Sequence, residues 1–193
     1  MAHSIPGVKD FNESNAIISK YPVNQDLSCT LHLPSIPTIG DMKENKWNTF
    51  TKLQPRIMTI VVSKEDRMIH VNTNLHDAFR EKRAEQEQFI AKKIQELQQK
   101  YFGYAIMLTG DFNETLYSPT FQVFLARMEA MGFQRVPIAE RTYSKQQQNL
   151  PIDHIFINQF IGLEDYKVVK DGEITETSDH YPVLAKVKLY KSN

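Results

Sequence analysis

Two long runs of apolar residues near the middle of the chain predict a buried β-hairpin. Residues 56–63 read RIMTIVVS and residues 67–74 read RMIHVNTN, and a short charged turn separates them. Continuous β-branched runs of this length are typical of strands that are buried on both faces. Between residues 78 and 100, apolar side chains recur at spacings of four, three and four from Ile90 to Tyr101. This period predicts an amphipathic helix directly after the hairpin.

The second half of the chain predicts further strands with one more helix among them. Strands are expected at residues 105–111, 152–158, 166–170 and 181–190. Ser118 followed by Pro119 predicts a helix start, with serine as the cap and proline at the first helical position, and Gly132 lies where the helix should stop. Hairpins followed by strands with intervening helices predict an α/β protein with mixed or antiparallel sheets and helices outside.

The first third of the chain has a weaker pattern. Two short apolar runs, residues 15–23 and 28–34, are each interrupted or ended by a proline, and they predict two short strands. Residues 36–55 contain proline, glycine and many polar side chains, and they predict a long loop. Trp47 and Phe50 are expected to pin this loop to the body of the protein.

Composition places the chain among ordinary globular proteins. Its 193 residues are enough for one domain with a sizeable core, so residues 1–193 are expected to form a single domain. The 23 basic and 23 acidic side chains cancel, which argues against a long nucleic-acid footprint. A single cysteine, Cys29, excludes an internal disulfide and fits a reducing compartment. Because we find neither a membrane-span pattern nor a signal-peptide core, we predict a cytoplasmic location.

A cluster of polar residues ends the strand predicted at residues 105–111. Gly110, Asp111 and Asn113 follow an apolar run, and the last two are two positions apart. If the chain is still extended there, both side chains point to the same side. The carboxylate could accept a proton or hold a metal, and the amide could donate to a phosphate oxygen. Gly, Asp and Asn also favour ordinary turns, so the motif by itself leaves both interpretations open.

Two further motifs combine carboxylates with imidazoles. Ser178, Asp179 and His180 precede the last predicted strand. Such a group could serve metal binding and acid–base catalysis, although a Ser-Asp pair is also a common turn. Asp153 interrupts an apolar strand, and a buried carboxylate is costly unless it is paired. His180 is a natural partner, because a carboxylate behind an imidazole fixes the tautomer and orientation of the ring, as in hydrolytic triads.

Taken in this order, the segments resemble the endonuclease/exonuclease/phosphatase superfamily of DNase I-like proteins. The resemblance rests on GDFN at residues 110–113, SDH at residues 178–180 and ID-x-IF between them, and it runs over residues 15–193. It implies a four-layer sandwich of two packed mixed sheets with helices outside, in agreement with the strand pattern. It also implies a divalent-metal-dependent phosphoesterase, a nuclease or phosphatase that hydrolyses a phosphodiester or phosphomonoester by metal-assisted attack of water.

The resemblance assigns roles to five residues. Asp111 would orient or deprotonate the attacking water and help to hold the metal, and Asp179 would be a further metal ligand. Asn113 would bind the scissile phosphate. His180 would contact the phosphate and act in acid–base chemistry, with Asp153 behind it. The implied cofactor is Mg²⁺ or Mn²⁺, and all five side chains are expected in one pocket.

The chain departs from the family pattern in two places. Where the family's NTHL motif presents a histidine to the phosphate, this chain has Asn74, which can donate a hydrogen bond but cannot become a cation. His76 lies on the same side if the strand continues, and it could substitute or be structural. The strand that carries the family's metal-binding glutamate has no counterpart before Asn15, where Glu13 is the one nearby carboxylate.

The missing N-terminal strands lead to further expectations. The sandwich is expected to be N-terminally incomplete, either as a piece of a longer protein or as a natural variant, and to bind the metal weakly. The alternative to an enzyme is a catalytically impaired phosphate-binding or interaction domain. An uncovered sheet edge would need a second copy of the chain in a homo-oligomer, a swapped strand or a covering loop.

The resemblance leaves the substrate open among nucleic acids, lipid head groups and inositol phosphates, because specificity in such folds lies in loops. The zero net charge favours a small or lipid-like phosphate ester. The loop at residues 36–55 is the candidate specificity element.

Overall fold

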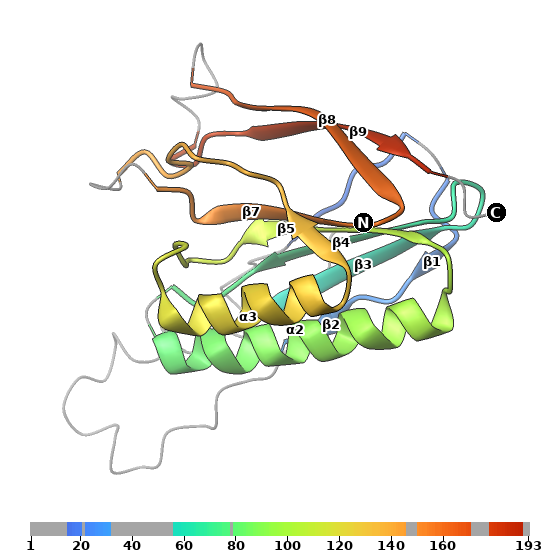
Figure 1. The fold of residues 1–193 in the computed structure, drawn as a ribbon, viewed down its shortest axis with the longest axis horizontal. Helices are drawn as coiled ribbons and strands as arrows, with labels where there is room; N and C mark the ends of the chain where they lie inside the picture. Colours follow the sequence, from blue (N-terminus) through green and yellow to red (C-terminus); the bar gives the residue numbers. More distant parts are fainter. Residues whose placement is uncertain are drawn as a thin grey trace, which may run out of the picture.

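Nine strands and two helices make up the part of the chain that the computed structural model describes (Figure 1). The described residues are 15–20, 22–31, 56–77, 79–145, 150–170 and 178–190. In chain order the elements are β1 (Gln25–Asp26), β2 (Cys29–Thr30), β3 (Ile57–Ser63), β4 (Met68–Asn74), α2 (Arg80–Lys100), β5 (Ala105–Asp111), α3 (Pro119–Ala130), β6 (Phe133–Arg135), β7 (Asp153–Asn158), β8 (Ile161–Val168) and β9 (Val183–Leu189).

Seven of the described strands form one mixed sheet. Its order is β1-β3-β4-β5-β7-β6, and β2 pairs with β3 next to β1. Among these described strands the pairings are antiparallel except for β4–β5, which is parallel. Parallel neighbours need a crossover connection, and α2 supplies it between β4 and β5. As a result, β4 and β5 end at the same edge of the sheet.

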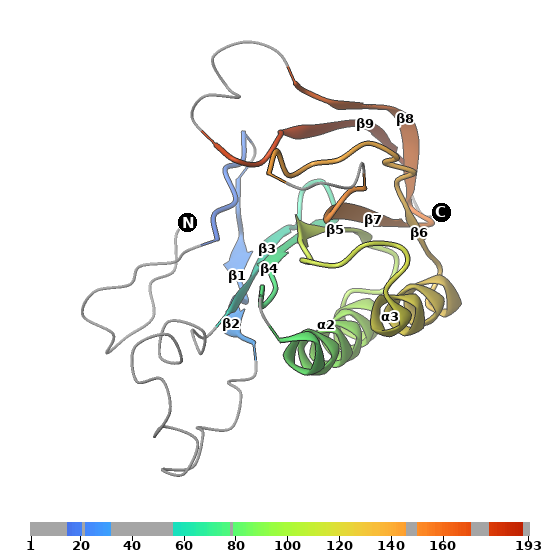
Figure 2. The ribbon, with the colours of Figure 1, turned by 90° about the vertical axis from the view of Figure 1, so that its left-hand side faces the viewer.

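The two helices lie side by side on one face of this sheet (Figure 2). α2 buries Ile90, Ile94 and Leu97, whose spacing predicted the helix, and α3 buries Phe121 and Phe124. Burying one such side chain contributes about 1.5–3 kcal/mol, so this apolar face holds the helices on the sheet. Neither helix in the described part of the chain has the length and apolar character needed to cross a membrane.

The ends of α3 follow the sequence signals in part. Ser118 is the N-cap and Pro119 the first helical residue, as predicted, but the Ser118 hydroxyl makes no capping hydrogen bond and lies 2.9 Å from Thr120 Oγ1. The helix ends at Ala130, and Gly132 has a φ of 82°. Glycine adopts this left-handed conformation freely, so Gly132 ends the helix as predicted.

β8 and β9 form a separate antiparallel hairpin over the opposite face of the large sheet (Figure 2). An apolar cluster that includes Val136, Ile155, Ile157 and Ile161 fills the space between them. Helices, large sheet and hairpin thus make three layers, which confirms the predicted α/β architecture with packed sheets and helices outside. The expected fourth layer, helices outside the second sheet, is not found among the described residues.

The short strands differ from the sequence-based prediction. Residues 15–20 contain an isolated bridge at Ala16 and no strand, so the strand predicted from residue 15 is wrong over this segment. β6 was not predicted, and β8 begins at Ile161 rather than at residue 166. Strands of two or three residues are too short to show a hydrophobic period, so tertiary pairing decides where they form.

The N-terminal segment covers part of a sheet edge. β1 and β2 pair with β3 on the side opposite β4, and Leu31 donates its backbone N–H to the carbonyl of Arg56 at 2.7 Å. At β3 the chain's own residues therefore provide the cover that an exposed edge needs. Pairing with a second copy stays a prediction. The loop at residues 36–55, with its two pinning aromatic residues, and Glu13 lie outside the described residues.

Candidate active site

One row of polar side chains crosses three neighbouring strands at the same end of the sheet. The register pairs Asn74 of β4 with Asp111 of β5, and Asp111 with Asp153 of β7. Side chains paired in register lie on the same face of a sheet. Two residues after Asp153, Ile155 packs in the cluster beneath the β8–β9 hairpin, so the row lies on the face turned away from the helices. Strand pairing therefore brings Asp111 and Asp153 together.

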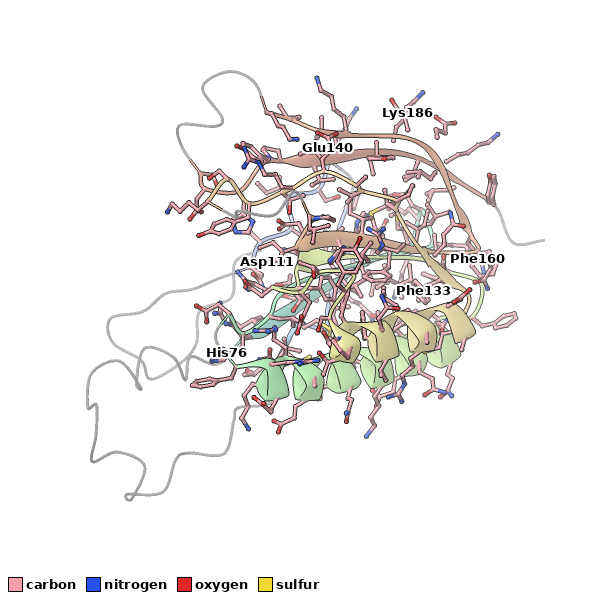
Figure 3. The ribbon with its side chains drawn as sticks, turned by 60° about the vertical axis from the view of Figure 1, so that its left-hand side comes forward. His76, Asp111, Phe133, Glu140, Phe160 and Lys186 are labelled. Carbon is pink, nitrogen blue, oxygen red and sulfur yellow. The ribbon has the colours of Figure 1, made fainter. Side chains whose placement is uncertain are left out.

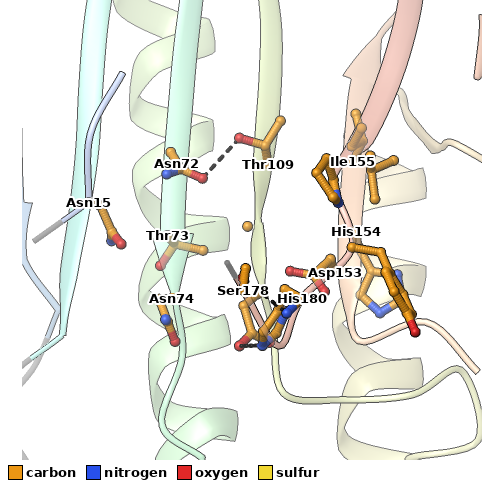
Figure 4. Close-up of a pocket in the computed structure, with 15 residues that line it drawn as sticks. Asn15, Asn72, Thr73, Asn74, Thr109, Asp153, His154, Ile155, Ser178 and His180 are labelled. Atoms are coloured by element: carbon orange, nitrogen blue, oxygen red, sulfur yellow. Dashed lines mark hydrogen bonds and ion pairs between the residues drawn. The ribbon is translucent and has the colours of Figure 1, made fainter. Parts of the chain in front are cut away.

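The segment before β9 carries His180 over this row (Figure 4). Its Nδ1 lies 2.9 Å from Asp153 Oδ2, and its Nε2 lies 3.7 Å from Asp111 Oδ2. An isolated bridge joins the backbones of Tyr143 and His180, and the two rings are 5.0 Å apart between centroids. The Ser178 hydroxyl accepts the backbone N–H of His180 at 3.1 Å. These contacts hold the imidazole in place from both sides.

The carboxylates on either side of His180 determine which ring nitrogen can exchange a proton with a substrate. An ionised Asp153 can only accept, so Nδ1–H of His180 donates to it and Nε2 is left facing Asp111. This hydrogen bond raises the pKa of His180 above its ordinary value. Burial, reinforced by the Asp153 carboxylate, raises the pKa of Asp111 to about 6. Asp111 therefore titrates close to neutral pH, and His180 is protonated more readily than an ordinary imidazole, which suits the two groups to acid–base chemistry.

The residues after β5 form a tight turn that supports Asp111. Asn113 has a φ of 51°, its backbone N–H donates to Asp111 Oδ1 at 2.8 Å, and its amide donates to Asp111 Oδ2 at 3.2 Å and to the Leu75 carbonyl at 3.0 Å. At Gly110 a Cβ atom would lie 2.1 Å from the Thr73 carbonyl oxygen, so only glycine fits. The motif is thus a turn and also the support of a carboxylate. A phosphate contact by Asn113 would have to replace one of its present bonds.

Asp179 is not brought into the same group. Its carboxylate is 46% exposed and lies 3.2 Å from Lys145 Nζ. This hydrogen bond with Lys145 lowers the pKa of Asp179. Of the five side chains expected in one pocket, Asp111, Asp153 and His180 meet directly, whereas Asp179 pairs with Lys145 and is not among the described residues that line the cavity.

His76 is also placed differently from the expectation. β4 ends at Asn74, so the alternation of strand side chains does not continue to residue 76. The His76 side chain is 1% exposed, its Nδ1 accepts the backbone N–H of Phe79 at 3.3 Å, and Figure 3 places it beside the start of α2 and away from Asp111. Its backbone N–H donates to Gln86 of α2 at 2.9 Å. His76 does not line the cavity described next, and its contacts are those of a structural residue.

The row opens into a cavity of about 580 Å³. Besides Asn74, Asp111, Asp153 and His180, the residues that line it include Ser178 and Tyr181. Three further lining residues, Asn15, Asn72 and Thr109, have no sequence-based assignment (Figure 4). Asn72 and Thr109 are paired in register, and the Thr109 hydroxyl donates to Asn72 Oδ1 at 3.0 Å. Each lies two residues before a member of the first row, so strand alternation could have predicted them. Asn15 reaches the cavity from a distant segment and has no such local signal.

The guanidinium group of Arg56 lies at the same edge of the sheet as Asn74. Nη1 of Arg56 lies 3.4 Å from Asn74 Oδ1, and its Nη2 lies 3.6 Å from Asp77 Oδ1. The positive charge of Arg56 is also one of the influences that oppose the burial-driven rise in the pKa of Asp111. The contact crosses from the start of β3 to the end of β4, so the local sequence does not reveal it.

Behind the site, Arg83 of α2 ties two loops together. Its Nε lies 2.7 Å from Glu114 Oε1, and its Nη1 donates to the carbonyls of His76 and Asp77 at 3.1 and 2.9 Å. The carbonyl of Glu114 lies 2.9 Å from Nε2 of His154. Burial lowers the pKa of His154 to about 4, so the ring is neutral and its Nε2–H donates to that carbonyl. The loops that follow β4 and β5 are therefore fixed relative to β7.

Three of the site residues could hold a metal ion. One ligand atom each from Asp111, Asp153 and His180 lie within 4.8 Å of one another. The carboxylate oxygens of Asp111 and Asp153 suit Mg²⁺ or Mn²⁺, which prefer oxygen ligands. Burial and the neighbouring Asp153 both disfavour the ionised form of Asp111, and a cation would relieve this. The donor set therefore fits a divalent cation.

The sequence model of the Endonuclease/Exonuclease/phosphatase family matches residues 6–180. Among solved structures, a mannosyl-6-phosphatase from Bacteroides thetaiotaomicron is similar with a TM-score of 0.65 and 18% identity, over 87% of this chain and 67% of its own. A family protein from Bacteroides vulgatus has a TM-score of 0.62 and 19% identity, over 88% of this chain and 66% of its own. The human Nocturnin catalytic domain with bound sulfate has a TM-score of 0.61 and 13% identity, over 87% of this chain and 60% of its own. No curated relative matches the sequence. The chain thus shares the fold and spans about two thirds of these proteins.

Proposed function

Because the chain belongs to the endonuclease/exonuclease/phosphatase family, we propose that it is a divalent-metal-dependent phosphoesterase. The observation that carries the proposal is the meeting of Asp111, Asp153 and His180 in a polar cavity. The proposed reaction is hydrolysis of a phosphodiester or a phosphomonoester by water.

The proposed mechanism uses Asp111 and His180, whose pKa values are both raised above their ordinary values. Asp111 accepts a proton from the attacking water while the new phosphorus–oxygen bond forms. His180 donates the Nε2 proton to the leaving alcohol while the ester bond breaks. Asp153 keeps the Nδ1–H of His180 paired, so the ring presents Nε2 to the substrate and its charged form is stabilised.

The proposed cofactor is Mg²⁺, with Mn²⁺ as an oxygen-preferring equivalent. Held by Asp111, with Asp179 as a further ligand once it leaves Lys145, the cation would supply positive charge to the phosphoryl oxygens. Asn74, which lines the cavity, is the proposed first contact of the phosphate, and Asn113 is a second contact if it releases Leu75.

The lining of the cavity bears on the substrate. Its described residues include the amides of Asn15 and Asn72 and the hydroxyls of Thr109 and Ser178, but no lysine or arginine. A long polyanion needs several cationic contacts, whereas amides and hydroxyls suit a small ester with polar substituents. Together with the zero net charge, this supports a small or lipid-like phosphate ester as the substrate class.

A second candidate function is a phosphate-binding domain with impaired catalysis. The observation that favours it is the pairing of Asp179 with Lys145, which leaves two carboxylates in the metal-competent group of the described residues. Loss of support around a metal lowers affinity or activity about 10–100-fold. Such a domain would bind phosphate without turning over an ester.

The two functions are separated by assaying p-nitrophenyl phosphate and bis(p-nitrophenyl) phosphate with Mg²⁺, with Mn²⁺ and with EDTA. The enzyme should show turnover that EDTA abolishes and that Asp111→Asn lowers about 100-fold or more. Asp165→Asn, which changes an exposed carboxylate on β8, is the matched control and should keep full activity. Turnover that survives both EDTA and Asp111→Asn would refute the proposal, and phosphate binding without turnover would support the second candidate.

A further inference from the structure

The side-chain amide of Asn74 is oriented by a neighbouring arginine. Arg56 Nη1 lies 3.4 Å from Asn74 Oδ1. A guanidinium group can only donate hydrogen bonds, so this contact requires the amide oxygen to face Arg56 and the NH₂ group to face elsewhere. Within the described part of the chain, that NH₂ group donates to no other residue, and Asn74 lines the cavity next to Asp111.

Arg56 is itself held in place. Its side chain is 10% exposed, and its Nη2 lies 3.6 Å from Asp77 Oδ1. Its backbone carbonyl accepts the N–H of Leu31, at the point where β3 begins. A guanidinium group anchored in this way loses little further freedom when it orients a neighbour, in contrast to an exposed side chain.

We propose that Arg56 is a positioning residue of this site, which turns the Asn74 amide so that its NH₂ group donates to an oxygen of the bound phosphate group. The inference rests on the proposed phosphoesterase function and names the device by which an asparagine serves where the resemblance expects a histidine. The amide supplies a neutral hydrogen-bond donor, and Arg56 fixes the direction in which that donor points.

The test is a double-mutant cycle with Arg56→Met, Asn74→Leu and the double variant. Binding of inorganic phosphate in Mg²⁺ buffer is measured by calorimetry, and KM and kcat are measured for p-nitrophenyl phosphate. Each single change should weaken phosphate binding about tenfold, because a hydrogen bond to a charged group is lost. The double variant should bind no more weakly than Asn74→Leu, since Arg56 acts through Asn74. Losses that multiply to about 100-fold would overturn the proposal.

Three further variants separate positioning from a structural effect. Asp77→Asn removes the ion pair between Arg56 and Asp77 and should weaken phosphate binding less than Arg56→Met does, and a loss equal to that of Arg56→Met would show that Arg56 only pins the loop. Arg56→Lys keeps the charge without the planar fork and should restore part of the binding. Asn74→Asp keeps the acceptor for Arg56 but lacks the NH₂ group, so it should lose binding even if Arg56→Met does not fold. Retained binding in Asn74→Asp would overturn the proposal.

Because phosphate binding is measured without turnover, the role of Arg56 and the proposed phosphoesterase activity can be refuted by different results. A wild-type chain that binds phosphate but hydrolyses no ester would refute the proposed activity and leave the role of Arg56 to the binding cycle. A wild-type chain that binds no phosphate would overturn the role of Arg56.

Discussion

Asp111 and Glu87 are both carboxylates whose pKa is raised mainly by burial, to about 6 and about 8 respectively. Asp111 lies at the end of β5 with its side chain 14% exposed, and it borders the cavity of about 580 Å³. Glu87 lies on α2, is 3% exposed, and borders a hollow of about 140 Å³ between α2 and α3. A second carboxylate adds to the shift in each case, Asp153 for the first and Glu114 for the second.

The two groups differ in how their charge is balanced. Beside α2, Glu114 is paired with Arg83 at 2.7 Å and Glu87 is protonated at neutral pH, so the charges around Glu87 cancel. At the end of the sheet, the carboxylates of Asp111 and Asp153 share one imidazole, that of His180. Burial by itself therefore does not identify a functional carboxylate. Uncompensated negative charge next to a cavity does, because a cation or a proton in transit can use it.

The largest expected effect comes from His180→Ala. It removes the proposed proton donor, and activity on a generic phosphate ester should fall about 10²- to 10⁴-fold. The stability should stay close to that of the wild type, because the ring is 31% exposed and is not part of either apolar cluster. The measurements are kcat/KM and urea unfolding. Wild-type turnover by this variant would remove His180 from the mechanism.

Arg83→Met, in contrast, should lower the stability of the fold. It leaves Glu114 buried without its cation, and breaking a buried pair in this way costs about 3–5 kcal/mol. Urea unfolding should show this loss. Arg80→Met changes an exposed arginine one turn earlier on α2 and should shift stability by less than about 0.5 kcal/mol. Equal effects of the two changes would mean that the Glu114 pair is not structural.

Glu87→Gln should flatten one part of the pH dependence of stability. The folded pKa of Glu87, about 8, lies above the ordinary value of 4.5. Between these values the unfolded chain is ionised while the folded chain holds the proton, so this group lowers the free energy of unfolding as the pH rises, by up to about 1.4 kcal/mol per pH unit. Above pH 8 its effect is constant. Glutamine cannot ionise, so the difference between variant and wild type should grow across this window. A constant difference from pH 5 to 8 would contradict the raised pKa.

The smallest expected effect concerns the exposed pair of Asp179 and Lys145. Lys145→Met releases the Asp179 carboxylate, whose pKa the hydrogen bond with Lys145 now lowers. If Asp179 joins the metal site, Mg²⁺ should bind a few-fold more tightly, as measured by calorimetry. Lys170→Met, which breaks the ion pair with Glu140, is the control and should leave Mg²⁺ affinity unchanged. Unchanged affinity in Lys145→Met as well would exclude Asp179 as a ligand.

The sequence by itself determined the features that depend on near neighbours. Side-chain periods predicted the hairpin of β3 and β4, the helix α2 and the strand β5, because each is long enough to show its repeat. The cost of burying Asp153 without a partner pointed to His180, and the structure places the two 2.9 Å apart. The resemblance to the endonuclease/exonuclease/phosphatase family is confirmed by the match over residues 6–180.

Tertiary structure decided the features that depend on register and on the ends of elements. Whether His76 shares a face with Asn74 depended on where β4 stops, and it stops before His76. Asp179 pairs with Lys145, which lies in another loop, so this contact could not be inferred from the position of Asp179 beside His180 in the sequence. Arg56, just before β3, contacts Asn74 at the end of the neighbouring strand β4, and the two residues are 18 positions apart in the chain. A local pattern specifies which side chains emerge at a strand end, whereas the pairing of distant strands specifies what those side chains meet.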